Sequence, residues 1–193
     1  MQLITSKDKV KIVIFRTKIY RRSTLTYSLR DQKMPAQLTI VDYIDRDHAE
    51  AFRDLNLEWI NEFFFVEDLD KDLLNNPRRE FIDSGGAIVM ALLDKQVVGC
   101  CGLIKHGEDV FEVSKMAVRK DLQGQGIGRL MMVEIIARAR SRGARDLEII
   151  SSTKLLPALK LYRSFGFEDV PLESDAYARG NIALRLRLES PLL

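Results

Sequence analysis

The stretch from Val110 to Arg142 constrains the chain most, because it combines a strand, a glycine-rich turn and a long helix. We predict the strand at residues 111–118 and the helix at about residues 127–142. The turn between them holds three glycines within five residues: Gly124, Gly126 and Gly128. Glycines let the backbone approach a ligand without a Cβ in the way, and the unpaired amides that begin a helix bind anions. This stretch therefore predicts a phosphate site at the start of the helix.

Three phosphate-binding patterns can be compared with this turn. A P-loop needs Lys followed by Ser or Thr after its glycines, and this pair does not follow Gly128. A dinucleotide-binding turn needs G-x-G-x-x-G, whereas this chain has G-x-G-x-G followed by Arg129. The pattern Q-x-x-G-x-G is met by Gln123, Gly126 and Gly128. A plain glycine-rich connection between a strand and a helix is the alternative, so the rest of the chain has to decide.

The distribution of charge divides the chain into two parts. Residues 1–36 carry nine Lys or Arg and two Asp, whereas the whole chain has a net charge of only +2. We predict a basic N-terminal extension over residues 1–36, and a flexible tail, an Arg-rich transit segment and residues upstream of a start at Met34 are the alternatives. With 46% hydrophobic residues in the chain, residues 37–193 are long enough to form one globular domain with a sizeable core.

The remaining composition indicates a cytoplasmic protein. Cys100 and Cys101 are adjacent in an apolar run, which predicts a buried strand and excludes a disulfide framework. No apolar run has the length of a transmembrane helix, and no signal-peptide pattern is found. With a net charge of +2, we expect neither a nucleic-acid partner nor a membrane partner.

A second motif, ALKLYRSFGF, begins thirty residues beyond Gly128 and ends at Phe167. Between the two motifs, residues 146–151 predict a strand that is parallel to residues 111–118, because a helix connects them. The two motifs together resemble those of the GNAT superfamily of N-acetyltransferases. The resemblance covers roughly residues 37–189 and implies a mixed α/β fold. In that fold a central sheet of about seven mostly antiparallel strands is splayed between its fourth and fifth strands and flanked by about four helices.

The resemblance implies acetyl-CoA as the acyl donor and no metal ion. The pantetheine arm would pair with the open edge of the fourth strand, and the glycine-rich turn would hold the pyrophosphate. The residues expected to bind the cofactor are Met116, Ala117, Val118, Gln123, Gly124, Gln125, Gly126, Ile127, Gly128, Arg129 and Ser152. Ser152 is included because Leu155 stands where the family usually has Asn, so a nearby hydroxyl would have to replace the lost amide.

Acyl transfer to an amine needs one group that takes the amine proton and another that protonates the leaving thiolate. The resemblance implies Glu112 as the base, since it precedes Gln123 by eleven residues. A water chain, or an exposed or ion-paired carboxylate without a catalytic role, is the alternative. The resemblance implies Tyr162 of the second motif as the acid, with a merely packed aromatic ring as the alternative. His48 and His106 are predicted to be surface or turn residues.

The acceptor is predicted to be a primary amine of a small molecule, which attacks acetyl-CoA directly in a ternary complex. The residues expected to bind it are Trp59, Phe63, Tyr177, Arg179 and Asn181. Arg179 is expected to bind an acidic group of the acceptor, with a solvated hairpin in which it pairs with Glu173 or Asp175 as the alternative. The acidic side chains within residues 58–70 indicate a cationic amine, with a solvated helix face as the alternative. A protein lysine or N-terminal acetyltransferase and a non-catalytic acyl-CoA sensor are the alternatives. A monomer and a homodimer are both compatible with the sequence.

Overall fold

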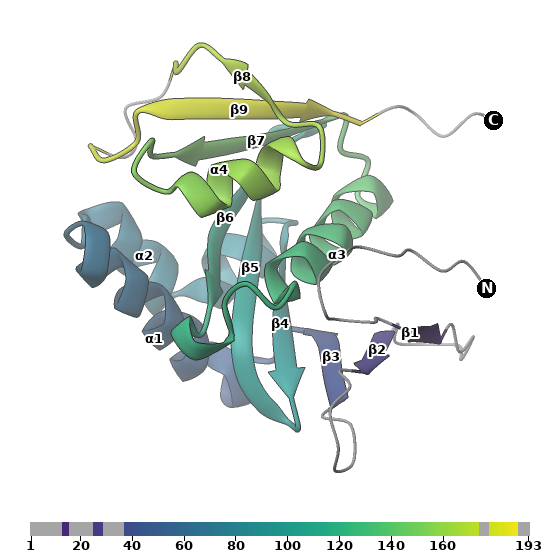
Figure 1. Cartoon of the computed structure of the whole chain (residues 1–193). Coiled ribbons are helices and arrows are strands. Elements are labelled where there is room, and N and C mark those ends of the chain that lie inside the picture. Colours follow the sequence, from purple (N-terminus) through teal and green to yellow (C-terminus); the bar gives the residue numbers. More distant parts are fainter. Residues whose placement is uncertain (1–12, 16–24, 29–36, 174–177, 189–193) are drawn as a thin grey trace.

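The computed structural model describes residues 13–15, 25–28, 37–173 and 178–188 of the chain. In these residues nine strands form one sheet, in the order β1-β2-β3-β4-β5-β6-β7-β9-β8 (Figure 1). All neighbouring strands are antiparallel except β6 and β7, which are parallel. The strands are β1 Val13–Phe15, β2 Leu25–Ser28, β3 Gln37–Asp42, β4 Ala87–Leu93, β5 Gln96–His106, β6 Val110–Val118, β7 Asp146–Ser151, β8 Glu168–Val170 and β9 Ile182–Arg187.

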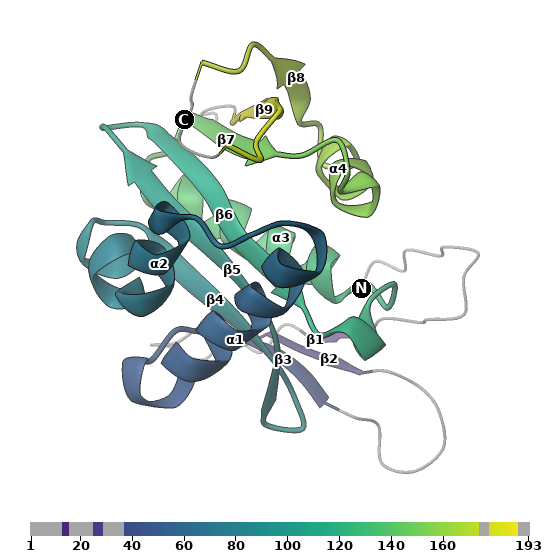
Figure 2. The ribbon, with the colours of Figure 1, turned by 90° about the vertical axis from the view of Figure 1, so that its left-hand side faces the viewer.

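Helices cover both faces of this sheet. The α-helices of the described residues are α1 Asp45–Phe63, α2 Asp68–Asn75, α3 Ile127–Ser141 and α4 Leu156–Arg163. α1 and α2 lie on one face, and α3 and α4 lie on the other (Figures 1 and 2). A π-helical turn, Arg78–Asp83, follows α2, and a short 3-10 turn, Lys120–Leu122, precedes the glycine-rich turn. From β3 onwards this is the fold that the resemblance implied, so the predicted fold is confirmed.

β4 consists only of apolar residues, and its place in the sheet explains why. Successive side chains of a strand point to opposite faces of the sheet. Val89 and Ala91 join the core beneath α3, whereas Ile88 and Met90 join the core beneath α1. A strand that is covered on both faces has to be apolar at every position, and each large apolar side chain that is fully buried contributes about 1.5–3 kcal/mol.

The sheet opens between β6 and β7, as predicted. The two strands pair only over Val110–Glu112, opposite Asp146–Glu148, and they diverge beyond this point. On its other edge β6 continues to pair with β5 as far as Val118, with a bulge opposite Cys101. The divergence therefore leaves the second half of β6 with a free edge that faces the separated end of β7.

Part of the N-terminal extension belongs to the sheet. Leu25–Ser28 run antiparallel to the first residues of β3, and β1 pairs in turn with β2. These strands lie at the edge of the sheet remote from β7. The rest of residues 1–36 lies outside the described residues.

The start of α1 corrects the prediction for His48. Its side chain is buried rather than on the surface, and Nδ1 accepts a hydrogen bond of 2.9 Å from the backbone N–H of Ile44, just before the helix. Burial lowers the pKa of His48, although the nearby Asp47 carboxylate acts in the opposite direction. His106 ends β5 and is about half exposed, as predicted.

Candidate active site

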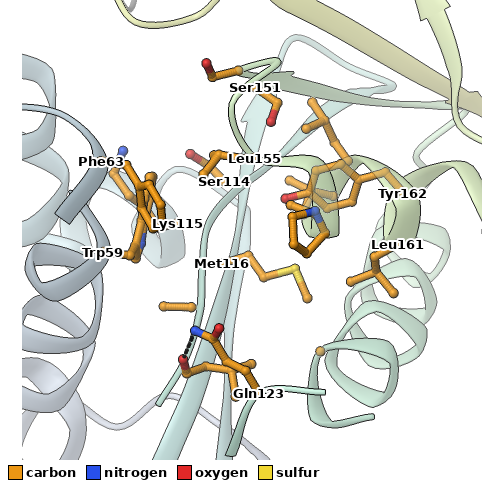
Figure 3. Close-up of a pocket in the computed structure, with 18 of the residues that line it drawn as sticks. Trp59, Phe63, Ser114, Lys115, Met116, Gln123, Ser151, Leu155, Leu161 and Tyr162 are labelled. Carbon is orange, nitrogen blue, oxygen red and sulfur yellow. Dashed lines mark hydrogen bonds between the residues drawn. The ribbon is translucent and has the colours of Figure 1, made fainter. Parts of the chain in front are cut away.

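A cleft of about 590 Å³ lies where β6 and β7 separate. It is lined by the free edge of β6, the glycine-rich turn, the first turn of α3, the end of β7, α4 and the end of α1. In Figure 3, Trp59 and Phe63 lie on one side of the cleft and Leu161 and Tyr162 on the other, with Met116 of β6 between them. The fold thus brings residues about one hundred positions apart around a single space.

The free edge of β6 forms the floor of the cleft. The predicted cofactor residues Met116, Ala117 and Val118 all line it. In the described residues this edge has no strand partner beyond Glu112, so its backbone groups are available to a ligand that pairs as a strand would. The bulge contains Lys115, whose φ of 52° is unusual for a residue with a side chain. A bulge turns the strand locally and so changes the direction of its amides and side chains.

The glycine-rich turn has the geometry that the predicted anion site requires. Gly124 and Gly126 have φ angles of 76° and 86°, in the left-handed region that favours glycine, and Gly126 caps α3. A Cβ at either glycine would meet no protein atom within 4 Å, so the space beside the turn is open. The first amides of α3 have no acceptor within the helix, and they carry the positive end of its dipole. These features suit a phosphate group.

Most of the predicted residues of this turn line the cleft. They are Gln123, Gly124, Gly126, Ile127, Gly128 and Arg129, whereas Gln125 does not line it. The side chain of Gln123 donates a hydrogen bond of 3.0 Å from Nε2 to the carbonyl of Val118, which ties the turn to β6 (Figure 3). The guanidinium of Arg129 donates a hydrogen bond of 3.0 Å to Ser164 and lies 4.7 Å from the centre of the Phe165 ring.

Tyr162 reaches the cleft from α4. Its ring packs against Phe167, with 6.2 Å between ring centres, and its hydroxyl points into the cleft (Figure 3). No hydrogen-bond partner for this hydroxyl is found among the described residues. Burial raises the pKa of Tyr162 well above its usual value, so the phenol keeps its proton in alkaline solution. A buried phenol that faces an open space can donate this proton to a ligand.

The end of β7 supplies two buried hydroxyl groups. Ser151 and Ser152 both line the cleft, as does Leu155. The backbone N–H of Lys154 donates a hydrogen bond of 3.4 Å to Oγ of Ser152, which fixes that side chain in the turn before α4. The hydroxyl that was predicted to replace the missing Asn is therefore present beside the cleft, next to the apolar Leu155.

The predicted acceptor wall is aromatic where it faces the cleft. Trp59 and Phe63 line the cleft as predicted, and Phe64, for which no role was predicted, lines it as well. Trp59 donates a hydrogen bond of 3.1 Å from Nε1 to the buried Asn56, and its ring meets that of Phe64 edge-on. Nζ of Lys154 lies 5.6 Å from the centre of the Phe64 ring and so reaches across the cleft.

Arg179 lies beside this wall, but its guanidinium is occupied by carboxylates of this chain. It donates a hydrogen bond of 2.9 Å to Glu67, and it donates two hydrogen bonds of 2.7 and 2.6 Å to the two oxygens of Asp70. Only 9% of the Arg179 side chain is exposed. Because its charge is already compensated, Arg179 is better placed to join parts of the fold than to bind an acidic group of the acceptor.

One further predicted acceptor residue does not line the cleft, and another lies outside the described residues. Asn181 does not line the cleft, and its side-chain amide is hydrogen-bonded to Thr153. Oδ1 of Asn181 accepts from the backbone N–H of Thr153 at 2.8 Å, and Nδ2 donates to the Thr153 hydroxyl at 2.9 Å. Asn181 therefore joins the start of β9 to the turn before α4. Tyr177 lies outside the described residues.

Glu112, the predicted base, does not line the cleft either. It is buried, and its carboxylate lies 3.0 Å from Nε2 of His106. This hydrogen bond, together with the nearby charges of Glu112 and Glu148, raises the pKa of His106 in spite of its partial burial. In the described residues Ser114, two positions further along the same strand, is the nearest residue of β6 on the same face that lines the cleft.

Among the described residues, the charged residues that line the cleft are all basic. They are Lys115, Arg129, Lys154 and Arg179. None of the acidic residues within residues 58–70 lines the cleft, so their carboxylates do not support the predicted cationic acceptor. Lys115 and Arg179 are both paired with Asp70, which leaves the acceptor side of the cleft largely apolar and without an exposed carboxylate among the described residues.

Several lining residues had no signal that could be recognised in the sequence. Ser114 and Lys115 lie in the β6 strand that was selected, but the bulge that turns Lys115 inward is a property of the pairing with β5. Phe64 follows Phe63 directly, and only the end of α1 decides that both face the cleft. The family resemblance at the glycine-rich turn was the signal that located the cleft.

Two negative findings concern the described residues only. No group of three or more His, Cys, Asp or Glu side chains in them is arranged to hold a metal ion. No helix among them combines the length and the apolar character that crossing a membrane requires. Cys100 and Cys101 are both buried, and neither forms a disulfide.

Comparison with protein families identifies this arrangement. The sequence model of the acetyltransferase (GNAT) family matches residues 52–167, which include the β6 edge, the glycine-rich turn and α4. The N-acetyltransferase C1271.07c of Schizosaccharomyces pombe is 30% identical over 124 residues, which are 62% of this chain and 76% of that protein. The mycothiol acetyltransferase of Thermobifida fusca is 39% identical over 65 residues, which are 34% of this chain and 20% of that protein.

Solved structures share the same fold. A GNAT-family acetyltransferase of Staphylococcus aureus superimposes with a TM-score of 0.70 at 22% identity, over 79% of this chain and 99% of that one. A GNAT-family acetyltransferase of Elizabethkingia anophelis, solved with acetyl-CoA bound, superimposes with a TM-score of 0.59 at 21% identity, over 78% of this chain and 98% of that one.

Proposed function

The chain belongs to the acetyltransferase (GNAT) family and is an acyltransferase, and from this premise we propose that it transfers an acetyl group from acetyl-CoA to a primary amine of a small molecule. One arrangement supports this function most. The free edge of β6, the amides that begin α3 and the hydroxyl of Tyr162 surround the same cleft. They match the three parts of an acyl-CoA that have to be held: the pantetheine arm, the pyrophosphate and the sulfur.

The residues present fit acetyl-CoA as the donor. In the described residues the edge of β6 from Met116 to Val118 has no strand partner on the side of β7, so its backbone groups can pair with the amides of the pantetheine arm. The turn at Gly124 and Gly126 leaves space for the pyrophosphate. Ser151 and Ser152 offer hydroxyl groups where the family usually supplies Asn. Acetyl-CoA supplies the thioester, whose carbon–sulfur bond breaks as the carbon–nitrogen bond to the acceptor forms.

The chemistry that this chain adds is positioning and proton transfer. Holding both reactants in the cleft replaces a collision between them with a reaction inside one complex. An amide of the free β6 edge, that of Met116 in our proposal, donates a hydrogen bond to the carbonyl oxygen as that oxygen becomes negative. Tyr162 gives its proton to the departing thiolate, and the phenolate regains a proton from solvent or from the acceptor ammonium.

The acceptor amine has to lose a proton before it attacks, because an alkyl ammonium ion has a pKa near ~10 and is not nucleophilic. Glu112 remains our proposal for the group that receives this proton. Because Glu112 does not line the cleft, a bridging water near Ser114 has to carry the proton between them. The hydrogen bond to the half-exposed His106 then connects Glu112 with solvent.

The shape of the acceptor side favours a small molecule over a protein substrate. The wall is aromatic, at Trp59, Phe63 and Phe64, and Arg179 spans from the segment before β9 to α2 and narrows the cleft. A peptide needs an open groove, whereas a compact aromatic wall suits a single apolar group. Because no carboxylate lines the cleft in the described residues, we expect an amine with an apolar or aromatic body and no second ammonium group.

Release of free CoA thiol tests this function. Wild-type protein is assayed with acetyl-CoA and four sets of acceptors: arylalkylamines, aromatic amino acids, polyamines and peptides with free N-terminal or lysine amines. We expect turnover with the first two sets and at least tenfold lower kcat/KM with polyamines and peptides. Preference for peptides would contradict the small-molecule acceptor. Binding of CoA without thiol release from any set would support a sensor instead.

The variant Tyr162→Phe tests the chemical role within the same assay. It keeps the ring and removes the proton donor, so we expect kcat to fall by about 10²-fold while KM for acetyl-CoA changes by less than about twofold. Tyr43→Phe is the matched control, because Tyr43 hydrogen-bonds Asp45 at 2.8 Å and does not line the cleft. Equal kcat values for the two variants would show that Tyr162 only packs.

A further inference from the structure

The carboxylate of Asp70 in α2 lies near the cleft and is fully buried, with 0% of the side chain exposed. It accepts four hydrogen bonds from three residues. Lys115 donates to Oδ1 at 2.9 Å, Arg179 donates to both oxygens, and the backbone N–H of Glu67 donates to Oδ2 at 3.0 Å. All these contacts lie within the described residues, and the three donor residues belong to three different segments.

These donors connect the three segments that form the acceptor side of the cleft. Lys115 belongs to the bulge of β6, Arg179 to the segment before β9, and Glu67 to the loop between α1 and α2. Glu67 adds a second connection, because Oε2 accepts from the backbone N–H of Ala178 at 2.9 Å. Arg179 itself lies outside the strands of the sheet, and in the described residues side-chain hydrogen bonds join it to α2 and to the loop before α2.

Among the described residues, the charges in this cluster are balanced, which explains how they can be buried together. Two carboxylates, Glu67 and Asp70, meet two cations, Lys115 and Arg179. Burial by itself raises the pKa of Asp70, but the hydrogen bonds from Arg179 and the charge of Lys115 outweigh it and hold that pKa below its usual value. A buried charge that loses its partner is strongly unfavourable, so each member of the cluster holds the others in place.

We propose that Asp70 is the positioning residue of the acceptor site: by holding Lys115, Arg179 and the loop that ends at Glu67, it fixes the aromatic wall opposite the free edge of β6. The inference rests on the proposed function, because it takes this side of the cleft to be where the acceptor binds. Asp70 does not line the cleft, so it acts through Arg179 and Lys115, which do.

The chain carries its own reporter of this arrangement. Trp59 is the single tryptophan of the sequence, it lies in the wall, and its ring is 5.9 Å from the guanidinium of Arg179. Its fluorescence therefore reads the position of Arg179 without any acceptor, and it remains informative if no amine proves to be a substrate. A failure of the proposed function and a failure of this inference can thus be told apart.

The test compares Asp70→Asn with a control of similar burial. Glu134→Gln removes one charge from another buried ion pair, in which Arg138 lies 2.6 Å from Glu134 on α3, away from the cleft. For Asp70→Asn we expect KM of the best acceptor to rise at least tenfold, CoA affinity by calorimetry to stay within twofold, and Trp59 emission to change. For Glu134→Gln we expect all three to stay at wild-type values, although its thermal stability can fall as well.

Two results would overturn the inference. In the first, folded Asp70→Asn has the acceptor KM and the Trp59 emission of the wild type. In the second, Asp70→Asn loses affinity for CoA and for the acceptor to the same extent. If Asp70→Asn fails to fold, Arg179→Lys keeps the charge balance and removes only the bidentate contact. We then expect the same change in acceptor KM and Trp59 emission, smaller in size, and unchanged values for that variant would equally overturn the inference.

Discussion

Tyr162 and Arg179 both lie at the cleft, but their polar atoms are in opposite situations. The guanidinium of Arg179 is held by two carboxylates of its own chain, whereas the hydroxyl of Tyr162 faces the cleft without a hydrogen-bond partner among the described residues. Buried polar groups are nearly always hydrogen-bonded, so the group that is left open is the one that a ligand is expected to satisfy. This contrast separates a residue that organises the site from one that is placed to react.

The two histidines of the chain give a prediction about stability. Burial lowers the pKa of His48, so the unfolded chain binds its proton more readily, and stability is lost as the pH falls below about 6.5. Hydrogen bonding to Glu112 raises the pKa of His106, so its contribution is present below about 6.5 and is lost as the pH rises through the folded-state pKa. The two dependences have opposite signs.

Denaturant unfolding between pH 5.5 and 8 separates the two pH dependences of stability, because the sequence has only two histidines and each can be replaced in turn. In His106→Gln the free energy of unfolding should rise with pH, by at most about 1.4 kcal/mol per pH unit. In His48→Gln it should fall with pH over the same interval. Parallel curves for the two variants would contradict the assigned roles, whichever variant is less stable at neutral pH.

At the scale of the element, the glycine-rich turn and α3 act as one unit. The left-handed φ of 86° at Gly126 allows the chain to leave β6 and enter α3 with the amides of the helix directed toward the cleft. Gly128 serves packing instead, since a Cβ there would lie 3.3 Å from Met116 and 3.5 Å from Leu161. The same short sequence thus combines an open turn, where we propose that the pyrophosphate binds, with a close contact among β6, α3 and α4.

The matched glycines Gly126 and Gly107 test this unit. Both have left-handed φ angles, 86° and 82°, and a Cβ at either would meet no atom within 4 Å, but only Gly126 lines the cleft. Gly126→Val and Gly107→Val should therefore lose similar thermal stability. Only Gly126→Val should lose CoA affinity, by at least tenfold, or about 1.4 kcal/mol, measured by calorimetry. Similar CoA affinities in the two variants would show that the pyrophosphate does not bind at this turn.

At the scale of the whole molecule, the cleft and the N-terminal strands occupy different parts of the sheet. β1 and β2 extend the edge beyond β3, whereas the cleft lies between β6 and β7, on the other side of β4 and β5 (Figure 1). No residue before Trp59 lines the cleft among the described residues. The central strands therefore separate the catalytic half of the molecule from its N-terminal edge.

A variant that starts at Met34 tests this separation. We expect kcat and KM to stay within about twofold of wild type, because the cleft is remote from the strands removed. We expect a lower melting temperature and more self-association in light scattering, because β3 becomes an unprotected edge strand. A folded variant without activity would place the N-terminal residues at the site, directly or through a second copy of the chain.

The sequence by itself determined the features that depend on local conformation. The spacing of Gly124, Gly126 and Gly128 before an apolar helix predicted the turn, because few residues other than glycine adopt left-handed φ angles. The resemblance of the second motif implied that Tyr162 belongs to the site, and Tyr162 of α4 lies at the cleft. The strands at residues 111–118 and 146–151 were predicted as well. The family resemblance joined these local features into the fold that the structure shows.

Only the tertiary structure decided which side chains meet across distant segments. Arg179 and Asp70 are 109 positions apart, and their hydrogen bonds exist because α2 and the segment before β9 meet over the splayed strands. This pairing speaks against the role predicted for Arg179, and Glu112 is likewise paired, with His106, and does not line the cleft. Periodicity and spacing determine the local backbone and the face of the element on which a residue lies. A buried charged side chain has no water to bind, so it pairs with the group that the packed fold brings within about 3 Å.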